Sequence, residues 1–175
     1  MIKEIKEVLF TEEQIQERIK ELGKEISEYY QGKNLVVVGV LKGAAPFMMD
    51  LIKQISIPLQ FDFIQVKSYE GTESGNITFK KGLDLNIKGM DILFVDDIID
   101  TAKSSTFILE HFKNSEANSI EFACLLDKRE NRKYDYNAKW TGFIIPNHFV
   151  IGYGLDYNER FRELKYIGIF DTKYC

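Results

Sequence analysis

The sequence predicts an α/β protein, a single domain (1–175) built on a mainly parallel sheet with helices on its flanks. Three largely apolar stretches, Leu35–Leu41, Ile92–Val95 and Ile120–Leu126, are typical of parallel strands that are buried on both faces. Helical segments alternate with these runs, and this alternation favours parallel strands joined by crossover helices. A chain of 175 residues fits one domain and can bury a core.

The composition narrows the range of partners and locations. Hydrophobic residues make up 45% of the chain and charged residues 29%, and the formal net charge is −4. Such acidity argues against a broad surface for nucleic acid or acidic membranes, and no apolar run is long enough to span a membrane. The N-terminus, MIKEIKEVLF, is too charged for a signal peptide. Cys124 and Cys175 form no disulfide framework, so we expect a cytoplasmic location.

The first predicted element is a helix that begins after Thr11. Thr11 and Gln14 resemble a capping box, apolar residues then recur at helical spacing from Ile15 to Ile26, and Gly32 closes the segment. We expect this helix to pack on the domain, and we assign it no chemistry.

The strand predicted at Leu35–Leu41 ends in a glycine-containing loop, Lys42-Gly43-Ala44. Glycine in such a loop lets the backbone approach a ligand closely. Pro46 then opens a helix, since the first helical turn does not need the donor that proline lacks.

Apolar residues at positions 59, 61, 63 and 66 predict a further strand, and the stretch 67–89 after it is poor in apolar residues. A loop of this length inside a compact domain is usually functional or disordered. A solvated β-hairpin is the structural alternative, and the two interpretations are compatible.

The stretch Ile92–Ser105 carries the clearest sign of chemistry. Asp96 and Asp97 follow the apolar run, Asp100 comes next, and small and hydroxyl-bearing residues then lead into an apolar-spaced helix. Free N–H groups at a helix start form a ready anion site, and acids beside it suit a ligand with both a phosphate and hydroxyls. Two alternatives are an acidic turn that merely caps a helix and an acid-rich helical motif of prenyl-pyrophosphate enzymes. The strand-like run argues against the second.

This central stretch resembles the signature of the type I phosphoribosyltransferases: two acids, two apolar residues, then Asp-Thr-small-Lys-Ser/Thr. The string LKGA, the lysine at position 128 and the stretch 149–162 resemble segments of the hypoxanthine-guanine members. The four motifs occur in the family's order between Val36 and Phe170. The resemblance implies the type I phosphoribosyltransferase fold, with a small C-terminal hood over the purine site and a mobile loop. Its ligand loops should lie at the carboxyl ends of the strands.

The resemblance also implies the reaction and the residues that carry it. The 5-phosphoribosyl group of 5-phosphoribosyl-1-pyrophosphate (PRPP) would pass to hypoxanthine and/or guanine, giving IMP or GMP and pyrophosphate. PRPP would contact Asp96, Asp97, Thr101, Ala102, Lys103, Ser104, Leu41, Lys42, Gly43, Ser68, Tyr69 and Arg162. The purine would contact Lys128, Phe149, Val150 and Asp156. Mg²⁺ would be the cofactor, with Asp156, Asp96 and Asp97 as candidate ligands. Asp100 would be the catalytic acid or base at the purine's imidazole nitrogen.

Some details follow from the resemblance alone. The peptide between Leu41 and Lys42 can be cis in this family, Ser68 and Tyr69 belong to the mobile loop, and relatives are usually homodimers or homotetramers. Asp96 replaces a common Glu, and Ala102 replaces a common Gly. If position 102 needs a positive φ, Ala would cost stability; in right-handed backbone it would be harmless.

Two other functions stay open. A regulator that senses PRPP and binds nucleic acid would need a basic face, which the acidic composition disfavours. A sibling enzyme could act on xanthine, adenine or a pyrimidine. Lys128 favours 6-oxopurines over adenine, but a charge cluster after a strand is normally a solvated turn. The sequence does not rank hypoxanthine, guanine and xanthine.

Overall fold

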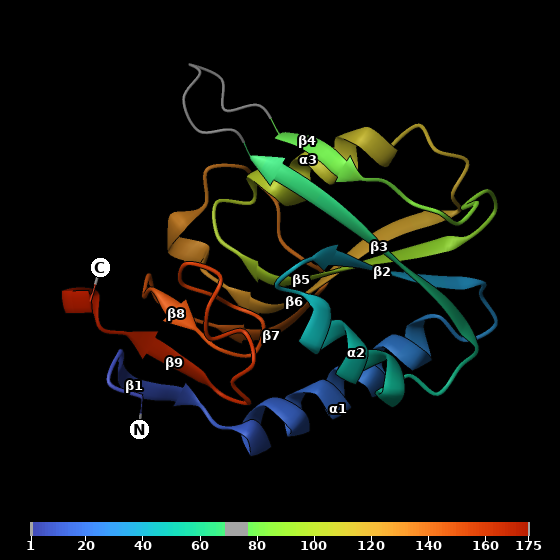
Figure 1. Ribbon diagram of the computed structural model, residues 1–175. Coiled ribbons are helices and arrows are strands. Elements are labelled where there is room, and N and C mark those ends of the chain that lie inside the picture. Colours follow the sequence, from blue (N-terminus) through green and yellow to red (C-terminus); the bar gives the residue numbers. More distant parts are fainter. Residues whose placement is uncertain (1, 69–76, 175) are drawn as a thin grey trace.

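The computed structural model describes residues 2–68 and 77–174, and its centre is a six-stranded sheet (Figure 1). The strands lie in the order β4 (Ile77–Lys81), β3 (Leu59–Ser68), β2 (Leu35–Leu41), β5 (Asp91–Ile99), β6 (Ser119–Asp127) and β7 (Trp140–Ile144). Every neighbouring pair is parallel except β3 and β4, which are antiparallel. The prediction of one α/β domain with a mainly parallel sheet is therefore confirmed.

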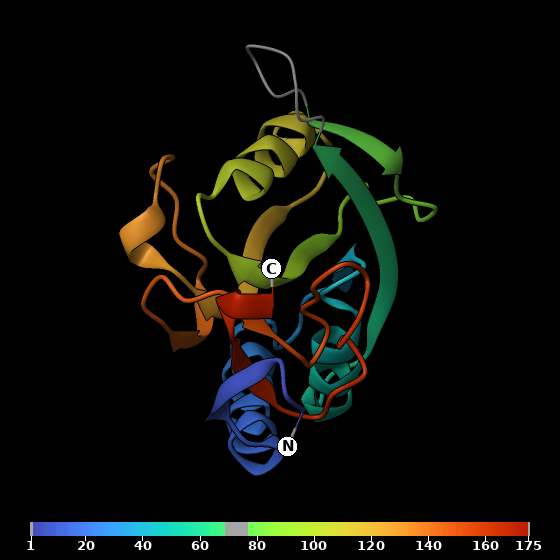
Figure 2. The same cartoon turned by 60° about the vertical axis from the view of Figure 1, so that its left-hand side comes forward.

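Helices cover both faces of this sheet (Figure 2). Helices α1 (Glu12–Tyr29) and α2 (Ala45–Gln54) lie on one face, and α3 (Lys103–Phe112) lies on the other. Alternate residues of β2 point to opposite faces, so Val37 packs in the core below α1 and α2 while Val36 packs beneath α3. Burial on both faces explains why the central strands are continuous apolar runs.

The first helix has the predicted N-terminus. The Thr11 hydroxyl accepts the Gln14 N–H at 3.3 Å, and Gln14 Oε1 accepts the Thr11 N–H at 2.9 Å. This reciprocal capping box satisfies two donors that the helix itself leaves unpaired. The apolar stripe that includes Ile15 and Ile26 is fully buried, and α1 packs along α2.

A second, three-stranded antiparallel sheet holds both ends of the described chain, which lie side by side in Figure 1. Its strands are β1 (Ile5–Phe10), β9 (Ile167–Phe170) and β8 (Val150–Ile151). We call this sheet, with the loop 152–166, the hood. The sequence predicted a C-terminal hood but not β1, whose partner lies at the other end of the chain.

The structure corrects the predicted end of β5 and shows a strand in the stretch after Val66. Strand β5 continues to Ile99, which pairs with Asp127, so Asp96 and Asp97 lie on the strand rather than in a loop after it. The stretch after Val66 contains β4, so its return segment is one strand of a β-hairpin. Tyr69 lies outside the described residues, and Ser68 is described only as the backbone end of β3. In the described chain, no helix is long and apolar enough to cross a membrane.

Candidate functional site

Two adjoining hollows lie at the carboxyl ends of the central strands. One, of about 200 Å³, is bounded by the end of β5 and the start of α3, from Asp96 to Ser105; we call it the α3 hollow. The other, of about 270 Å³, is lined by Lys128, Phe149, Val150 and Asp156; we call it the Phe149 hollow. Asp97, Ile98 and Asp100 line both. Parallel strands end at one edge of the sheet, which is why motifs distant in sequence meet here.

Asp97 and Gly43 bring the loops after β5 and β2 into contact. A Cβ atom at Gly43 would lie 1.8 Å from Oδ2 of Asp97, so any other residue there would displace the Asp97 carboxylate or the loop. The next contact is with the hood, since a Cβ at Gly154 would lie 2.0 Å from the carbonyl oxygen of Gly43. Gly154 has a φ of +98°, which favours glycine independently. The peptide between Leu41 and Lys42, at the start of this loop, is cis, as the resemblance implied.

Asp96, which is buried, and Asp97, which is half-buried, form an acidic pair at the end of β5. Asp96 Oδ1 accepts the backbone N–H of Asp97 at 3.0 Å, and Asp97 Oδ1 accepts that of Ile98 at 2.9 Å. Burial and the adjacent Asp97 carboxylate raise the pKa of Asp96 well above its usual range, and burial also raises the pKa of Asp97. A ligand that brings hydroxyl donors or a cation would relieve this cost, so the pair is suited to such a ligand.

Ala102 adopts the left-handed conformation at the start of α3. Its φ is 65° and its ψ is 13°, which answers the question left open by the sequence. No described side chain caps the helix there, although the Lys103 N–H lies 3.4 Å from the Thr101 hydroxyl oxygen. The first-turn residues Lys103, Ser104 and Ser105 line the α3 hollow, so the start of the helix lies beside this hollow, as an anion site requires.

Asp100 is held between two donors from the turn after β6. Lys128 Nζ lies 3.5 Å from Asp100 Oδ2, and Asn131 Nδ2 donates to Asp100 Oδ1 at 3.0 Å. The Lys128 side chain is only 9% exposed, whereas that of Asp100 is 44% exposed. Lys128 is therefore a buried ammonium that lines the Phe149 hollow, and the interpretation as a solvated turn charge is wrong.

The sequence did not single out Arg132, which fixes the backbone around Asp100. Its Nη1 donates to the carbonyl oxygens of Ile99 at 3.1 Å and Asp100 at 2.6 Å. Its Nη2 pairs with the fully buried carboxylate of Asp127, and its Nε donates to the Tyr136 carbonyl at 2.8 Å. A basic residue in a turn gives no sequence signal that distinguishes this role from a solvated charge.

Phe149 presents part of its ring to the Phe149 hollow. Its side chain is an exposed large hydrophobic group, 46% exposed, next to the buried Val150. Tyr157 and Phe170 contact the ring edge-on, with centroids 6.0 Å and 5.5 Å away. These two aromatic residues support the ring and leave it available to stack on a planar ligand.

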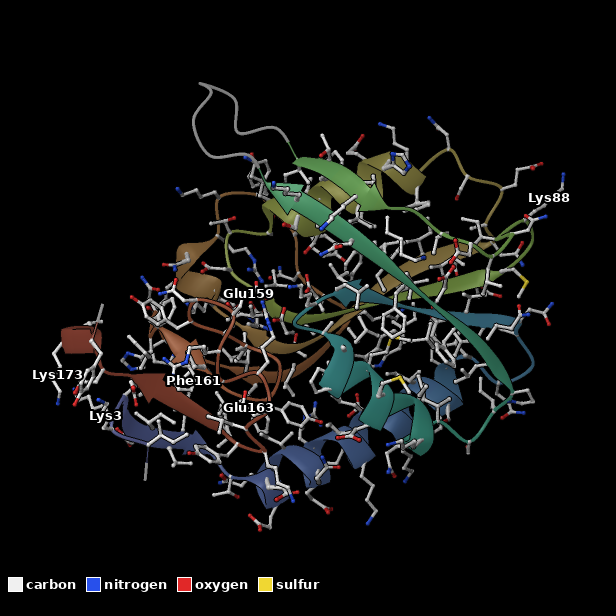
Figure 3. The ribbon with its side chains drawn as sticks, in the orientation of Figure 1. Lys3, Lys88, Glu159, Phe161, Glu163 and Lys173 are labelled. Carbon is white, nitrogen blue, oxygen red and sulfur yellow. The ribbon has the colours of Figure 1, made fainter. Side chains whose placement is uncertain are left out.

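The hood loop places Asp156 and Arg162 beside the hollows. Arg162 Nη2 lies 2.8 Å from Asp156 Oδ1, and its Nη1 donates to the Gly154 carbonyl at 2.6 Å. Glu159, labelled on this loop in Figure 3, accepts Lys42 Nζ at 2.6 Å. The loop thus carries an alternating set of charges that reaches the glycine loop after β2.

The structure brings the predicted site residues to one end of the main sheet, apart from Tyr69 and the side chain of Ser68. Leu41, Lys42, Gly43 and Arg162 do not line either hollow. The last three form the adjoining rim through contacts with Glu159, Asp97 and Asp156, and Leu41 precedes them at the end of β2. Among the described residues, no cluster of three or more His, Cys, Asp or Glu side chains could hold a metal ion by itself.

Comparison with known proteins agrees with this arrangement. The family model described as "Phosphoribosyl transferase domain" matches residues 8–158. A hypoxanthine-guanine phosphoribosyltransferase of Streptococcus agalactiae is 45% identical over 168 residues, which cover 95% of this chain and 93% of the relative. The chain is also 45% identical to the bifunctional protein TilS/HprT of Listeria monocytogenes, but spans only 26% of its length.

Solved structures show the same fold. A hypoxanthine phosphoribosyltransferase from Staphylococcus aureus superposes with a TM-score of 0.94 at 46% identity, covering 98% of this chain and 94% of the other. The enzyme of that name from Trypanosoma cruzi, in complex with the product IMP, also has a TM-score of 0.94, at 36% identity. That alignment covers 100% of this chain and 99% of the other.

Proposed function

The chain belongs to the phosphoribosyltransferase family, and we propose that it salvages purines by transferring the 5-phosphoribosyl group of PRPP to hypoxanthine and/or guanine. The products are IMP or GMP and pyrophosphate. The observation that carries this proposal is the meeting of an acidic, phosphate-suited α3 hollow with an aromatic Phe149 hollow at Asp97 and Asp100. The named relatives, which cover nearly the whole chain, support the choice of substrates.

PRPP occupies the α3 hollow in this proposal. The first turn of α3 and the hydroxyls of Thr101 and Ser104 bind the 5′-phosphate, with Ala102 and Lys103 completing that loop. Asp96 and Asp97 accept hydrogen bonds from the ribose hydroxyls, which suits carboxylates whose charged form is disfavoured by desolvation.

The pyrophosphate group binds at the rim, which is formed by the loop after β2 and the loop of the hood. Backbone groups of Leu41, Lys42 and Gly43 approach it closely because Gly43 has no side chain. Arg162 brings a guanidinium to this rim, a group whose planar N–H donors can bind pyrophosphate oxygens. We keep Ser68 and Tyr69 as further contacts, on the resemblance alone.

The purine occupies the Phe149 hollow. Phe149 stacks on its face, Val150 supplies backbone groups at its edge, and Lys128 donates to the exocyclic oxygen of a 6-oxopurine. Asp100 exchanges a proton with the purine's imidazole nitrogen. Positive charge builds on the ribose ring as pyrophosphate departs, so catalysis depends mainly on positioning and electrostatics.

Magnesium fits the donors that are present. Carboxylates of Asp96, Asp97 and Asp156 are hard oxygen ligands, and Mg²⁺ usually takes one or two such groups together with substrate phosphates. If the substrate phosphates supply most of the oxygen ligands to Mg²⁺, the protein needs no cluster of three or more metal-binding side chains, and the described residues contain none. Bound Mg²⁺ would offset the pyrophosphate charge. We further propose a cytoplasmic location, supported by the buried free thiol of Cys124, and a homodimer or homotetramer.

A purine series tests the proposal. The purified chain with PRPP and Mg²⁺ should release pyrophosphate when hypoxanthine or guanine is added. Adenine should give little, because Lys128 finds no exocyclic oxygen on it, and the xanthine rate would show whether the enzyme prefers that base. PRPP binding with no release of pyrophosphate for any base would overturn the proposal in favour of a PRPP-sensing protein.

A further inference from the structure

Asn131 connects the two halves of the Phe149 hollow. It ends the short 3₁₀ helix η1 (Arg129–Asn131), which follows β6 directly. Its single amide nitrogen, Nδ2, donates to Asp100 Oδ1 at 3.0 Å and to Asn147 Oδ1 at 2.7 Å. A side-chain amide has two N–H groups, so one nitrogen can serve both acceptors. The carboxylate at the end of β5 is thereby tied to the loop that leads into Phe149.

We propose that Asn131 is a positioning residue that orients the carboxylate of Asp100 toward the purine and holds it in register with the purine-stacking loop. The inference rests on the proposed function, in which Asp100 exchanges a proton with the base. A general acid or base must lie within about 2.6–3.2 Å of its proton, so the direction in which Asp100 points decides its use.

Asp100 needs a second donor because Lys128 has another task. Lys128 contacts Asp100 at 3.5 Å, a long ion pair, and it also lines the hollow where the purine oxygen would lie. An ammonium that turns toward the purine gives up part of its hold on Asp100. The Asp100 side chain is 44% exposed, so without Asn131 its rotamers would be free to face water.

Asn131 itself stands on a fixed support. The Lys128 N–H donates to the Ile99 carbonyl at 2.9 Å, and the Asn131 N–H donates to the Lys128 carbonyl at 3.1 Å. Arg132, the next residue, donates hydrogen bonds to the carbonyl oxygens of Ile99 and Asp100. The turn after β6 is therefore fixed to the backbone of Asp100, and the Asn131 amide has only to fix the side-chain torsions of Asp100.

The contact with Asn147 extends this control to the purine loop. Asn147 lies two residues before Phe149, and the Phe170 N–H donates to the Phe149 carbonyl at 2.8 Å, which anchors the far end of the loop to the hood. Loss of the Asn131 amide would free both the base and the stacking loop. A misplacement of about 1 Å can lower a rate by orders of magnitude.

The test compares Asn131→Ala with Asn118→Ala. Asn118 also donates through Nδ2, to the Gly89 carbonyl at 2.7 Å, but at the opposite end of the strands, so it controls for the loss of an amide. We expect kcat with hypoxanthine and guanine to fall about tenfold in Asn131→Ala, the size expected for a hydrogen bond to a charged group. KM for PRPP should change less than about twofold, and Asn118→Ala should keep kcat.

A double-mutant cycle separates positioning from a general structural role. If Asn131 acts mainly through Asp100, Asn131→Ala should lower kcat much less in an Asp100→Asn background, where only its contact with Asn147 is left to lose. Equal losses in both backgrounds, or an unchanged kcat in Asn131→Ala alone, would overturn the inference. If Asp100→Asn itself keeps wild-type turnover, the proposed role of Asp100 fails, and the inference fails with it. Loss of turnover in Asp100→Asn with normal turnover in Asn131→Ala overturns only the role of Asn131.

Discussion

Gly43 lies so close to Asp97 that a Cβ atom on Gly43 would come within 1.8 Å of the Asp97 carboxylate oxygen Oδ2. The glycine loop after β2 can therefore approach the acidic end of β5 this closely because Gly43 has no side chain. This contact sets the distance between the residues proposed to bind the pyrophosphate and those proposed to bind the ribose.

Gly43→Ala should push these loops apart. The added methyl must displace Asp97 or the loop backbone, and such overpacking typically costs about 1–3 kcal/mol. We expect KM for PRPP to rise at least about tenfold, while the chain still folds. Gly82→Ala is the matched control, because a Cβ at Gly82 would meet no atom of the described residues within 4 Å. Equal PRPP kinetics in the two variants would show that the contact does not matter.

Asp100→Asn should slow turnover while PRPP still binds. The amide keeps the size of the carboxylate but cannot accept the proton, and loss of general acid–base catalysis costs about 10²- to 10⁴-fold in rate. Single-turnover rates with each purine, together with PRPP binding by calorimetry, provide the measurement. A variant within a few-fold of wild type would remove Asp100 from the mechanism.

Lys128→Ala should weaken the use of 6-oxopurines far more than PRPP binding. A charged donor to the exocyclic oxygen contributes about 1.5–3 kcal/mol, or roughly ten- to a hundredfold in kcat/KM. Arg129→Ala is the control, because Arg129 is the adjacent cation but its side chain is 54% exposed and pairs with Asp127. If kcat/KM for hypoxanthine and guanine matched in the two variants, Lys128 would not bind the purine.

The sheet and the central motif could be predicted because their signals are local. Continuous apolar runs identified β2, β5 and β6, and the acids, the glycine and the hydroxyls that follow them revealed the ligand loops. The roles expected of Asp97, Gly43 and Phe149 came from the resemblance of their motifs, and the structure places Asp97 and Phe149 in the hollows and Gly43 against Asp97.

The remaining features depend on contacts between distant parts of the chain. Strand β1 is half exposed and gains its order from β9, so its own sequence carries little signal. Asn131 and Arg132 look like ordinary turn residues until their bonds to Asp100 are known. The resemblance raised a positive φ at position 102, where Gly is common, but alanine rarely adopts this conformation, so the sequence left the choice between the two backbones open.

Ala102→Gly should leave stability nearly unchanged. Relief of a left-handed alanine contributes about 1–2 kcal/mol. The loss of a buried methyl costs about 0.8 kcal/mol, and the added freedom of the unfolded chain costs about 0.4–1 kcal/mol. The terms nearly cancel, so urea unfolding should shift by less than about 1 kcal/mol. Ala102→Val should cost about 2 kcal/mol or more, since a branched side chain fits this φ poorly; equal stability of the two variants would contradict the account.

Asp62 provides a pH-dependent anchor for the β3–β4 hairpin. Its carboxylate accepts the backbone N–H groups of Phe63, Asp84 and Leu85 at 2.7, 2.7 and 3.1 Å, and Lys81 Nζ lies 3.3 Å away. Burial alone would raise the pKa of Asp62, but these donors more than offset it, and the pKa is lowered. A carboxyl whose folded pKa lies below its unfolded value of about 3.9 adds stability above that value, and this stability is lost as pH falls through the folded pKa.

Asp62→Asn should therefore destabilise the chain by about 2 kcal/mol at neutral pH, because an amide NH₂ faces backbone donors that the carboxylate accepted. The gap in unfolding free energy between wild type and variant should stay constant from pH 7 to about pH 5 and narrow below about pH 4. Asp84→Asn is the control, since that side chain is 80% exposed and pairs with the same Lys81 at 2.9 Å, so its loss should cost less than about 1 kcal/mol. Urea unfolding at a series of pH values measures both, and a gap that widened on acidification would refute the anchoring role of the Asp62 carboxylate.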